Sequence, residues 1–192
     1  MSGGIQRFSQ NARRALSQSH AEAVALGQST ITDLHLLIAL ATDEGMAGRI
    51  LSWQGANLDD VRRIVLHKLS TSKKVRKTGK IQLDESIQRV LEGAAEVARQ
   101  RKSDEIKPAH LLFALEKNPS SRLETVMDVS GLDRDRILEE LEDQLTLSLA
   151  QSELPALLET LEFCSRLFPE DVAVQNQLDR IAEILREYFG ED

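Results

Sequence analysis

Apolar residues recur every three or four positions along most of this 192-residue chain, which is the spacing of one face of an α-helix. The first 70 residues contain four such runs, over about residues 9–26, 33–42, 46–53 and 58–69. Ser, Asn and Gly occupy the positions before or after these runs, where such residues cap helices. The pattern therefore predicts four short helices joined by short loops.

The second half of the chain repeats this plan. The decapeptide ITDLHLLIAL at residues 31–40 is matched by IKPAHLLFAL at residues 106–115, so that His35 and His110 lie 75 positions apart. Because ordered matches continue over about 65 residues, two copies of one helical unit are the simplest explanation. The same offset aligns further pairs: Phe8 with Leu83, Arg14 with Arg89, Leu16 with Leu91, and Ala23 with Ala98.

The second copy also carries its own helix signals. Asp84 is placed to cap its first helix, and Pro108 suits the first turn of its second. Gly131 precedes a fourth helix that we expect to end at about Leu145. The predicted fold is therefore all-α, with copies at about residues 6–69 and 81–146 in one domain of residues 1–146.

A further helical pattern follows in residues 147–192. It contains two apolar runs, separated by Pro169 and spaced as one seam on each of two helices. We expect an αα-hairpin whose seams pack on each other or on the repeats, or else bind a partner or a second copy. The two runs are Leu157, Leu161, Cys164 and Phe168, then Val174, Leu178, Ile181, Leu185 and Tyr188.

Charge and composition narrow the function classes. The formal net charge is −7, and the one basic run, residues 70–80, lacks the interleaved aromatic residues typical of nucleic-acid binding. We read that run as a linker and expect no nucleic-acid partner. The only cysteine, Cys164, excludes an internal disulfide. No membrane-spanning run or secretory signal is visible, so we expect a cytoplasmic protein without a membrane partner.

Residues that could carry chemistry are few. His35 and His110 recur with the repeat, and a histidine at a helix N-terminus more often forms a hydrogen bond or packs than binds a metal. Cys164 lies on a predicted apolar seam, where cysteine behaves as a small hydrophobe. Trp53 is expected to anchor the core, or to contact a partner if it is exposed. No phosphate-binding loop or catalytic motif occurs, so we expect no enzyme, cofactor or metal.

The repeated segments resemble the Clp N-terminal repeat domain of ClpA- and ClpC-type chaperones. The resemblance rests on Phe8-Ser9-x-x-Ala12-Arg13, on the start at Leu83, and on the two Ile-x-x-x-His-Leu-Leu-x-Ala-Leu segments. It covers about residues 6–146. It implies a pseudo-twofold pair of four-helix repeats that binds protein substrates and adaptors without catalysis. Because no ATPase motif accompanies the repeats, it also implies an accessory or adaptor protein that acts with a Clp protease or chaperone.

One departure from the family concerns the histidine segments. ClpC-like members have Glu before the histidine, an acid that helps to recognise phosphoarginine, whereas Leu34 and Ala109 occupy these places here. The sequence therefore favours a neutral or apolar groove. By motif position, the expected partner-binding residues are Phe8, Ser9, Thr32, Asp33 and Leu34 in the first copy, and Leu83, Asp84, Lys107, Pro108 and Ala109 in the second.

Two functional hypotheses remain at this point. In the first, the repeats bind a Clp chaperone, its protease or client proteins, and modulate delivery of substrates for degradation. In the second, the repeat fold serves an unrelated complex, and residues 147–192 supply the partner or dimer surface. An enzyme would need a polar pocket with convergent titratable groups.

Overall fold

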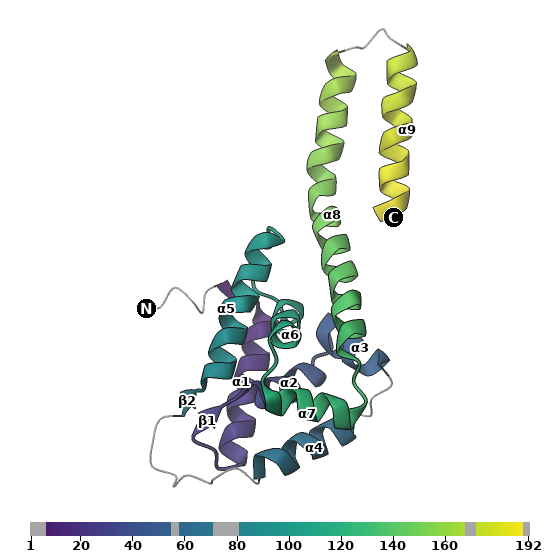
Figure 1. Cartoon of the computed structure of the whole chain (residues 1–192). Coiled ribbons are helices and arrows are strands. Elements are labelled where there is room, and N and C mark those ends of the chain that lie inside the picture. Colours follow the sequence, from purple (N-terminus) through teal and green to yellow (C-terminus); the bar gives the residue numbers. More distant parts are fainter. Residues whose placement is uncertain (1–6, 55–57, 71–80, 168–171, 190–192) are drawn as a thin grey trace. The chain divides into compact units, whose positions relative to one another are not determined.

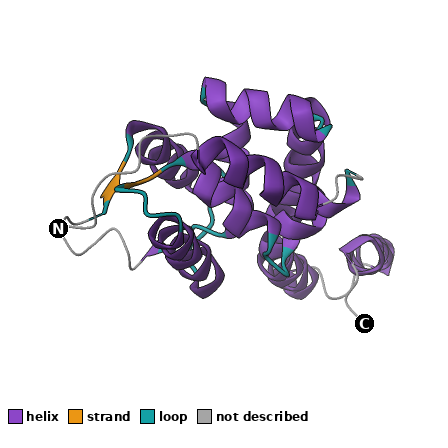
Figure 2. Ribbon diagram, turned by 90° about the horizontal axis from the view of Figure 1, so that it is seen from below, coloured by secondary structure: helices purple, strands orange, loops and turns teal. Residues whose placement is uncertain are grey.

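The computed structural model describes residues 7–54, 58–70, 81–167 and 172–189. The chain divides into two compact units, Met1–Asp143 and Gln144–Asp192, called here the repeat unit and the hairpin unit. Helices make up most of the described structure, and each of the two strands has only two residues (Figure 2). The all-α prediction is therefore confirmed.

The repeat unit follows the predicted order of helices and adds two short strands that were not expected. The expected third helix, residues 46–53, has those bounds, whereas the fourth helix of the second copy does not end at Leu145 but continues as part of α8. Residues 71–80 of the predicted linker lie outside the described residues, and so does Gly55, the predicted stop of the third helix. Ser70 is described and is the last residue of the fourth helix. The elements are α1 (Gln10–Ala25), β1 (Thr30–Ile31), α2 (Asp33–Ala41), α3 (Met46–Trp53), α4 (Leu58–Ser70), β2 (Gln82–Leu83), α5 (Glu85–Gln100), α6 (Pro108–Lys117), α7 (Ser121–Ser130) and the start of α8 (Arg134–Leu167).

The ends of α1 and α5 show that the two copies share one backbone design. Gly27 (φ +65°) follows α1 in the left-handed conformation, and Lys102 (φ +50°), 75 positions later, does the same after α5. The next residue then closes the same bond in each copy: Gln28 N–H donates to Ala23 O and Ser103 N–H to Ala98 O, both at 2.9 Å. Each helix thus ends in the same type of C-cap.

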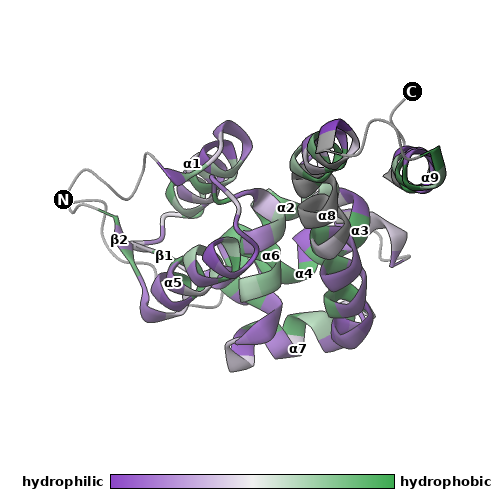
Figure 3. Ribbon diagram, turned by 90° about the horizontal axis from the view of Figure 1, so that it is seen from above, coloured by the Kyte–Doolittle hydropathy of each residue, from purple (hydrophilic) through white to green (hydrophobic). Residues whose placement is uncertain are grey.

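The core of the repeat unit is built on α2 and α6. Every residue of α2 is buried, and α6 is buried from Pro108 to Glu116. Helix α1 packs on α2, and α5 packs on α6. Figure 3 shows α6 largely green in the middle of this unit, with purple outer faces on the helices around it. This arrangement accounts for the two apolar decapeptides, because a helix that is apolar all round must be covered on all sides.

The two copies are joined by short parallel strand pairs that cross between them. β1 pairs with β2, with Ile31 opposite Leu83, and the two strands lie side by side in Figure 1. An isolated parallel bridge pairs Phe8 with Ile106. Phe8 lies 75 positions before Leu83, and Ile106 lies 75 positions after Ile31. The pairs Ile31–Leu83 and Phe8–Ile106 are therefore equivalent contacts. The segment before the first helix of each copy pairs with the segment before the second helix of the other.

The hairpin unit contains the end of α8 and α9 (Val172–Phe189), which lie side by side. Gln175 and Ser165 join them near the turn, since Ser165 Oγ donates to Gln175 Oε1 (2.6 Å) and Gln175 Nε2 donates to Ser165 O (2.8 Å). A helical hairpin is therefore present. Among the described helices, none has the length and apolar character that a membrane span requires.

Only part of the predicted seam packs between the two helices of this hairpin. Leu157 and Ile181 are 47% and 45% exposed, whereas their neighbours Leu158 and Ala182 lie between the helices. Leu161 and Leu178 lie there too, as expected. The side chains of four other predicted seam residues, Cys164, Phe168, Leu185 and Tyr188, lie outside the described set.

Candidate functional site

The crossed strand pairs build two related sites. Site A comprises residues 31–34 with Leu83 and Asp84, and site B comprises residues 106–109 with Phe8 and Ser9. In site A, Asp84 N–H donates to Ile31 O at 3.0 Å, and in site B, Ser9 N–H donates to Ile106 O at the same distance. The expected grouping by copy is therefore corrected: each site takes one segment from each repeat.

The repeated histidines cap the helices that begin at these sites. His35 Nδ1 accepts a hydrogen bond from Thr32 N–H, and His110 Nδ1 accepts one from Lys107 N–H, both at 3.0 Å. Each histidine is the third residue of its helix and reaches back to the N-cap residue, as Glu or Gln does in a capping box. The histidines recur because the helix start recurs.

The environment of both rings keeps them neutral. His35 is fully buried and His110 is 2% exposed. Burial lowers the pKa of each ring to about 4, although Glu22, Asp33 and Asp84 oppose the shift at His35. Because Nδ1 accepts a backbone hydrogen bond, the single ring proton is placed on Nε2. Each neutral imidazole therefore serves as a structural cap of its helix.

Site A carries two carboxylates. Asp84 Oδ1 accepts from Ser86 N–H (2.7 Å) and Ser86 O–H (2.5 Å), and Ser86 Oγ accepts from Asp33 N–H (3.2 Å). Asp33 is 3% exposed, and its Oδ1 accepts from Leu34 N–H at 2.9 Å. Its Oδ2 has no hydrogen-bond partner among the described residues. These groups fix the starts of α2 and α5 against each other and make site A acidic.

Site B has the opposite character. Lys107 and Pro108 stand where Thr32 and Asp33 stand in site A, and Ser9 replaces Asp84. Ser9 Oγ caps α1 by accepting from Ala12 N–H at 3.2 Å. No carboxylate belongs to the residues that define this site. The two sites therefore share one backbone but differ in charge, and they are suited to different ligands.

Most of the expected site residues are buried in the core. Only Leu83, at 42% exposure, and Lys107 are exposed, while Ser9 and Asp84 are intermediate. The accessible part of each site is thus its outer edge, and the groove itself is filled by the protein's own side chains. The buried members are Phe8, Thr32, Asp33, Leu34, Pro108 and Ala109.

Trp53 shows that the core expectation was wrong for one large side chain. It is 64% exposed at the end of α3, and Val129 near the end of α7 is 63% exposed. The buried stripe of α3 is formed by Ala47, Ile50 and Leu51, and Trp53 lies well off that stripe on a helical projection. The exposure of Trp53 could therefore have been predicted from its position on the helix. An exposed tryptophan is a frequent anchor in protein interfaces.

Glu116 is the most unusual titratable group. It is fully buried at the end of α6, and neither carboxylate oxygen has a hydrogen-bond partner among the described residues. Burial raises its pKa to about 8, and the positive charge of Arg134 limits that rise. Arg134 Nε donates to the backbone carbonyl of Glu116 at 2.6 Å rather than to its carboxylate. In the described part of the chain, no cluster of three or more His, Cys, Asp or Glu could hold a metal ion.

Comparison with known proteins places these features in a family. The family model described as the Clp repeat (R) N-terminal domain matches residues 7–124 and again residues 82–157. The first match spans the first copy and most of the second, and the second match spans the second copy and continues to residue 157.

Solved structures share the fold at low sequence identity. The N-terminal domain of ClpD from Arabidopsis thaliana is 23% identical (TM-score 0.61), over 73% of this chain and 99% of that one. The Hsp104 N-terminal domain from Candida albicans is 20% identical (TM-score 0.62), over 70% and 88%. The N-terminal domain of the ClpV1 ATPase from E. coli is 22% identical (TM-score 0.55), over 73% and 88%.

Proposed function

This chain belongs to the Clp repeat N-terminal domain family, and we propose that it is an adaptor that modulates substrate recognition or delivery by a Clp chaperone and its protease. Domains of this family are protein-interaction modules of Clp chaperones. We assign binding to residues 1–146 and treat residues 147–192 as a separate hairpin. The proposal places the chain in the cytoplasm and gives it no catalytic step.

The observation that carries the proposal is the accessible edge of the two crossed sites. Leu83 is exposed at site A and Lys107 at site B, whereas their counterparts in the other site, Phe8 and Thr32, are buried, and the charges around the two edges differ. Such a pair of edges can hold two different protein segments in a fixed relation, as an adaptor requires. Trp53 extends the candidate surface with an aromatic anchor. The ClpD domain belongs to a chaperone described as caseinolytic protease associated, and we extend that association to this chain.

Affinity purification tests the proposal. The tagged full-length chain, expressed in its own cells, is expected to recover a Clp chaperone, a Clp protease subunit or their clients by mass spectrometry. The variant Leu83→Asp/Lys107→Glu should lose most of this recovery. Val24→Asp is the matched control, since Val24 is also exposed (53%) but belongs to neither site. Recovery without any Clp component, together with unchanged client turnover on deletion, contradicts the proposal.

A second candidate function is favoured by the exposed apolar residues of the hairpin unit. There the repeat fold supports an unrelated complex, and the hairpin makes the contact. Under this alternative, the Leu83→Asp/Lys107→Glu variant retains its partners, whereas substitutions on the hairpin remove them.

A further inference from the structure

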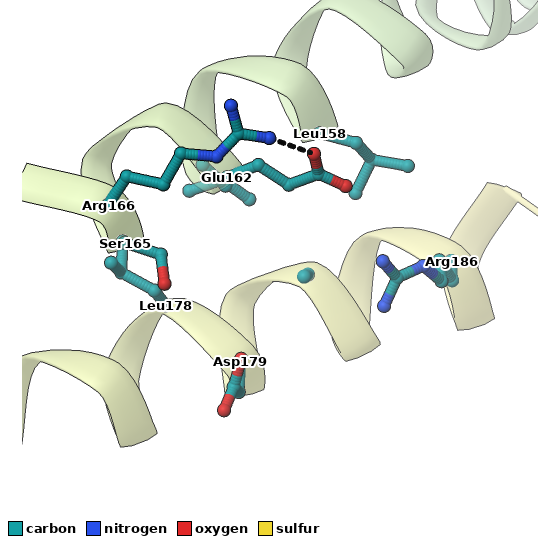
Figure 4. A pocket seen from close by; sticks show the side chains of 9 residues that line it. Leu158, Glu162, Ser165, Arg166, Leu178, Asp179 and Arg186 are labelled. Atoms are coloured by element: carbon teal, nitrogen blue, oxygen red, sulfur yellow. Dashed lines mark ion pairs between the residues drawn. The ribbon is translucent and has the colours of Figure 1, made fainter. Parts of the chain in front are cut away.

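The hairpin unit has two faces of different chemistry. On one face lies a pocket of about 290 Å³, with Leu158, Leu161, Leu178 and Ala182 between the helices. Charged side chains of both signs surround it, as Figure 4 shows, and Arg166 pairs with Glu162 at 3.6 Å. Asp179 and Arg186 line it from α9. This face is therefore polar at its rim.

The opposite face is apolar. Leu157 on α8 and Ile181 and Ile184 on α9 are 47%, 45% and 53% exposed, and none of them lines the pocket. Leu157 precedes Leu158 by one residue, and Ile181 precedes Ala182 by one, a rotation of about 100° in each helix. Because the helices of a hairpin run in opposite directions, this rotation carries both residues to the same face. Ile184 follows Ile181 by three residues and extends it.

We propose that this apolar face, formed by Leu157, Ile181 and Ile184, binds the same face of a second copy of this chain, so that two hairpins form a four-helix bundle. Its described polar neighbours one turn away are the uncharged Thr160 and Gln177 and, at the edge beside Ile184, the charged Arg180. Two copies can therefore meet over Leu157 and Ile181 without opposing like charges. The charged residues that line the pocket lie on the other side of each hairpin.

The composition of the face argues for a second copy over a charged partner. The segment 147–192 carries 3 basic and 10 acidic residues. None of the described carboxylates lies among the three aliphatic side chains of this face, so the face itself offers a basic partner no opposite charge. Two helices with one seam also bury little apolar surface, and a four-helix arrangement gives each helix a second apolar neighbour. A twofold axis lets one patch serve as its own complement. The proposal is independent of the function assigned to the repeats.

Sedimentation of the full-length chain over a range of concentrations tests the proposal. The wild type is expected to form a dimer whose population rises with concentration. Ile181→Asp/Ile184→Asp, and separately Leu157→Asp, should weaken the dimer at least tenfold, because each would bury a carboxylate without a partner. Phe163→Asp is the matched control, since Phe163 is 61% exposed but lies about 120° around α8 from Leu157.

Circular dichroism establishes that each variant retains its helices before its mass is compared. A wild-type chain that stays monomeric at every concentration overturns the proposal, and so does a dimer that the Leu157 and Ile181 variants leave unchanged. A dimer lost equally in the Phe163 variant also contradicts it.

Discussion

Histidine in the repeated motif is a structural residue in this protein. His35 and His110 recur with the repeat, and both accept a hydrogen bond from the backbone N–H that would otherwise be unpaired at a helix start. The sequence could predict that the two residues share a role, since their surroundings match. It could not show that the ring faces back to the N-cap, because that depends on the burial that α1 and α5 provide.

This role predicts how acid affects the protein. The folded pKa of each ring is about 4, below the unfolded value of 6.5, so the unfolded chain binds more protons between these values. Stability is therefore lost as the pH falls from 6.5 towards 4, by up to about 3 kcal/mol for each ring. Glutamine preserves the cap without titrating. The double variant His35→Gln/His110→Gln should lose less stability than the wild type over this range.

Urea unfolding of both proteins at a series of pH values measures the effect. Glu116 contributes with the opposite sign, because its raised pKa makes stability fall as the pH rises towards 8, and it is common to both proteins. The difference between them therefore isolates the histidines. Stability curves that run parallel from pH 7 to pH 4 would show that the rings do not cap as described.

At the scale of the element, most helices could be predicted from apolar spacing and caps, and the errors have physical causes. The helix end expected at Leu145 is wrong, because the apolar spacing of α8 continues into the hairpin without a stop signal. On α8, Leu158 lies between the helices where Leu157 was expected. Leucine occupies both positions, so the apolar spacing alone fits either residue. The choice between them depends on tertiary contacts with α9, which the spacing does not contain.

The matched ends of α1 and α5 give a second prediction. Lys102 is held in the left-handed conformation that Gly27 adopts freely in the other copy. Lys102→Gly should raise the free energy of unfolding by about 0.5–1 kcal/mol, and Gly27→Ala should lower it by about 1 kcal/mol. A Cβ on Gly27 would meet no atom within 4 Å, so only the backbone is strained. Thermal or urea unfolding checks both, and changes of the same sign would contradict the shared cap.

At the scale of the whole molecule, the crossing of the two repeats is what sequence reasoning missed. The offset of 75 residues shows that the copies are alike, but it fits pairing within a copy as well as pairing between copies. Pairing within a copy would place Phe8 beside residues 32–34, whereas in the structure Phe8 pairs with Ile106. The crossing places one segment of each copy at each site and leaves Leu83 and Lys107 at the outer edges. The functional proposal depends on these edges.

Hydroxyl-radical footprinting of the full-length chain, alone and with a purified Clp chaperone–protease complex from the same source, tests the central claim most directly. We predict that the complex lowers the reactivity of Leu83, Lys107 and Trp53 and leaves Leu157 and Ile181 unchanged. Unchanged reactivity at the site edges, with the complex in excess, would contradict the account, and so would protection confined to the hairpin.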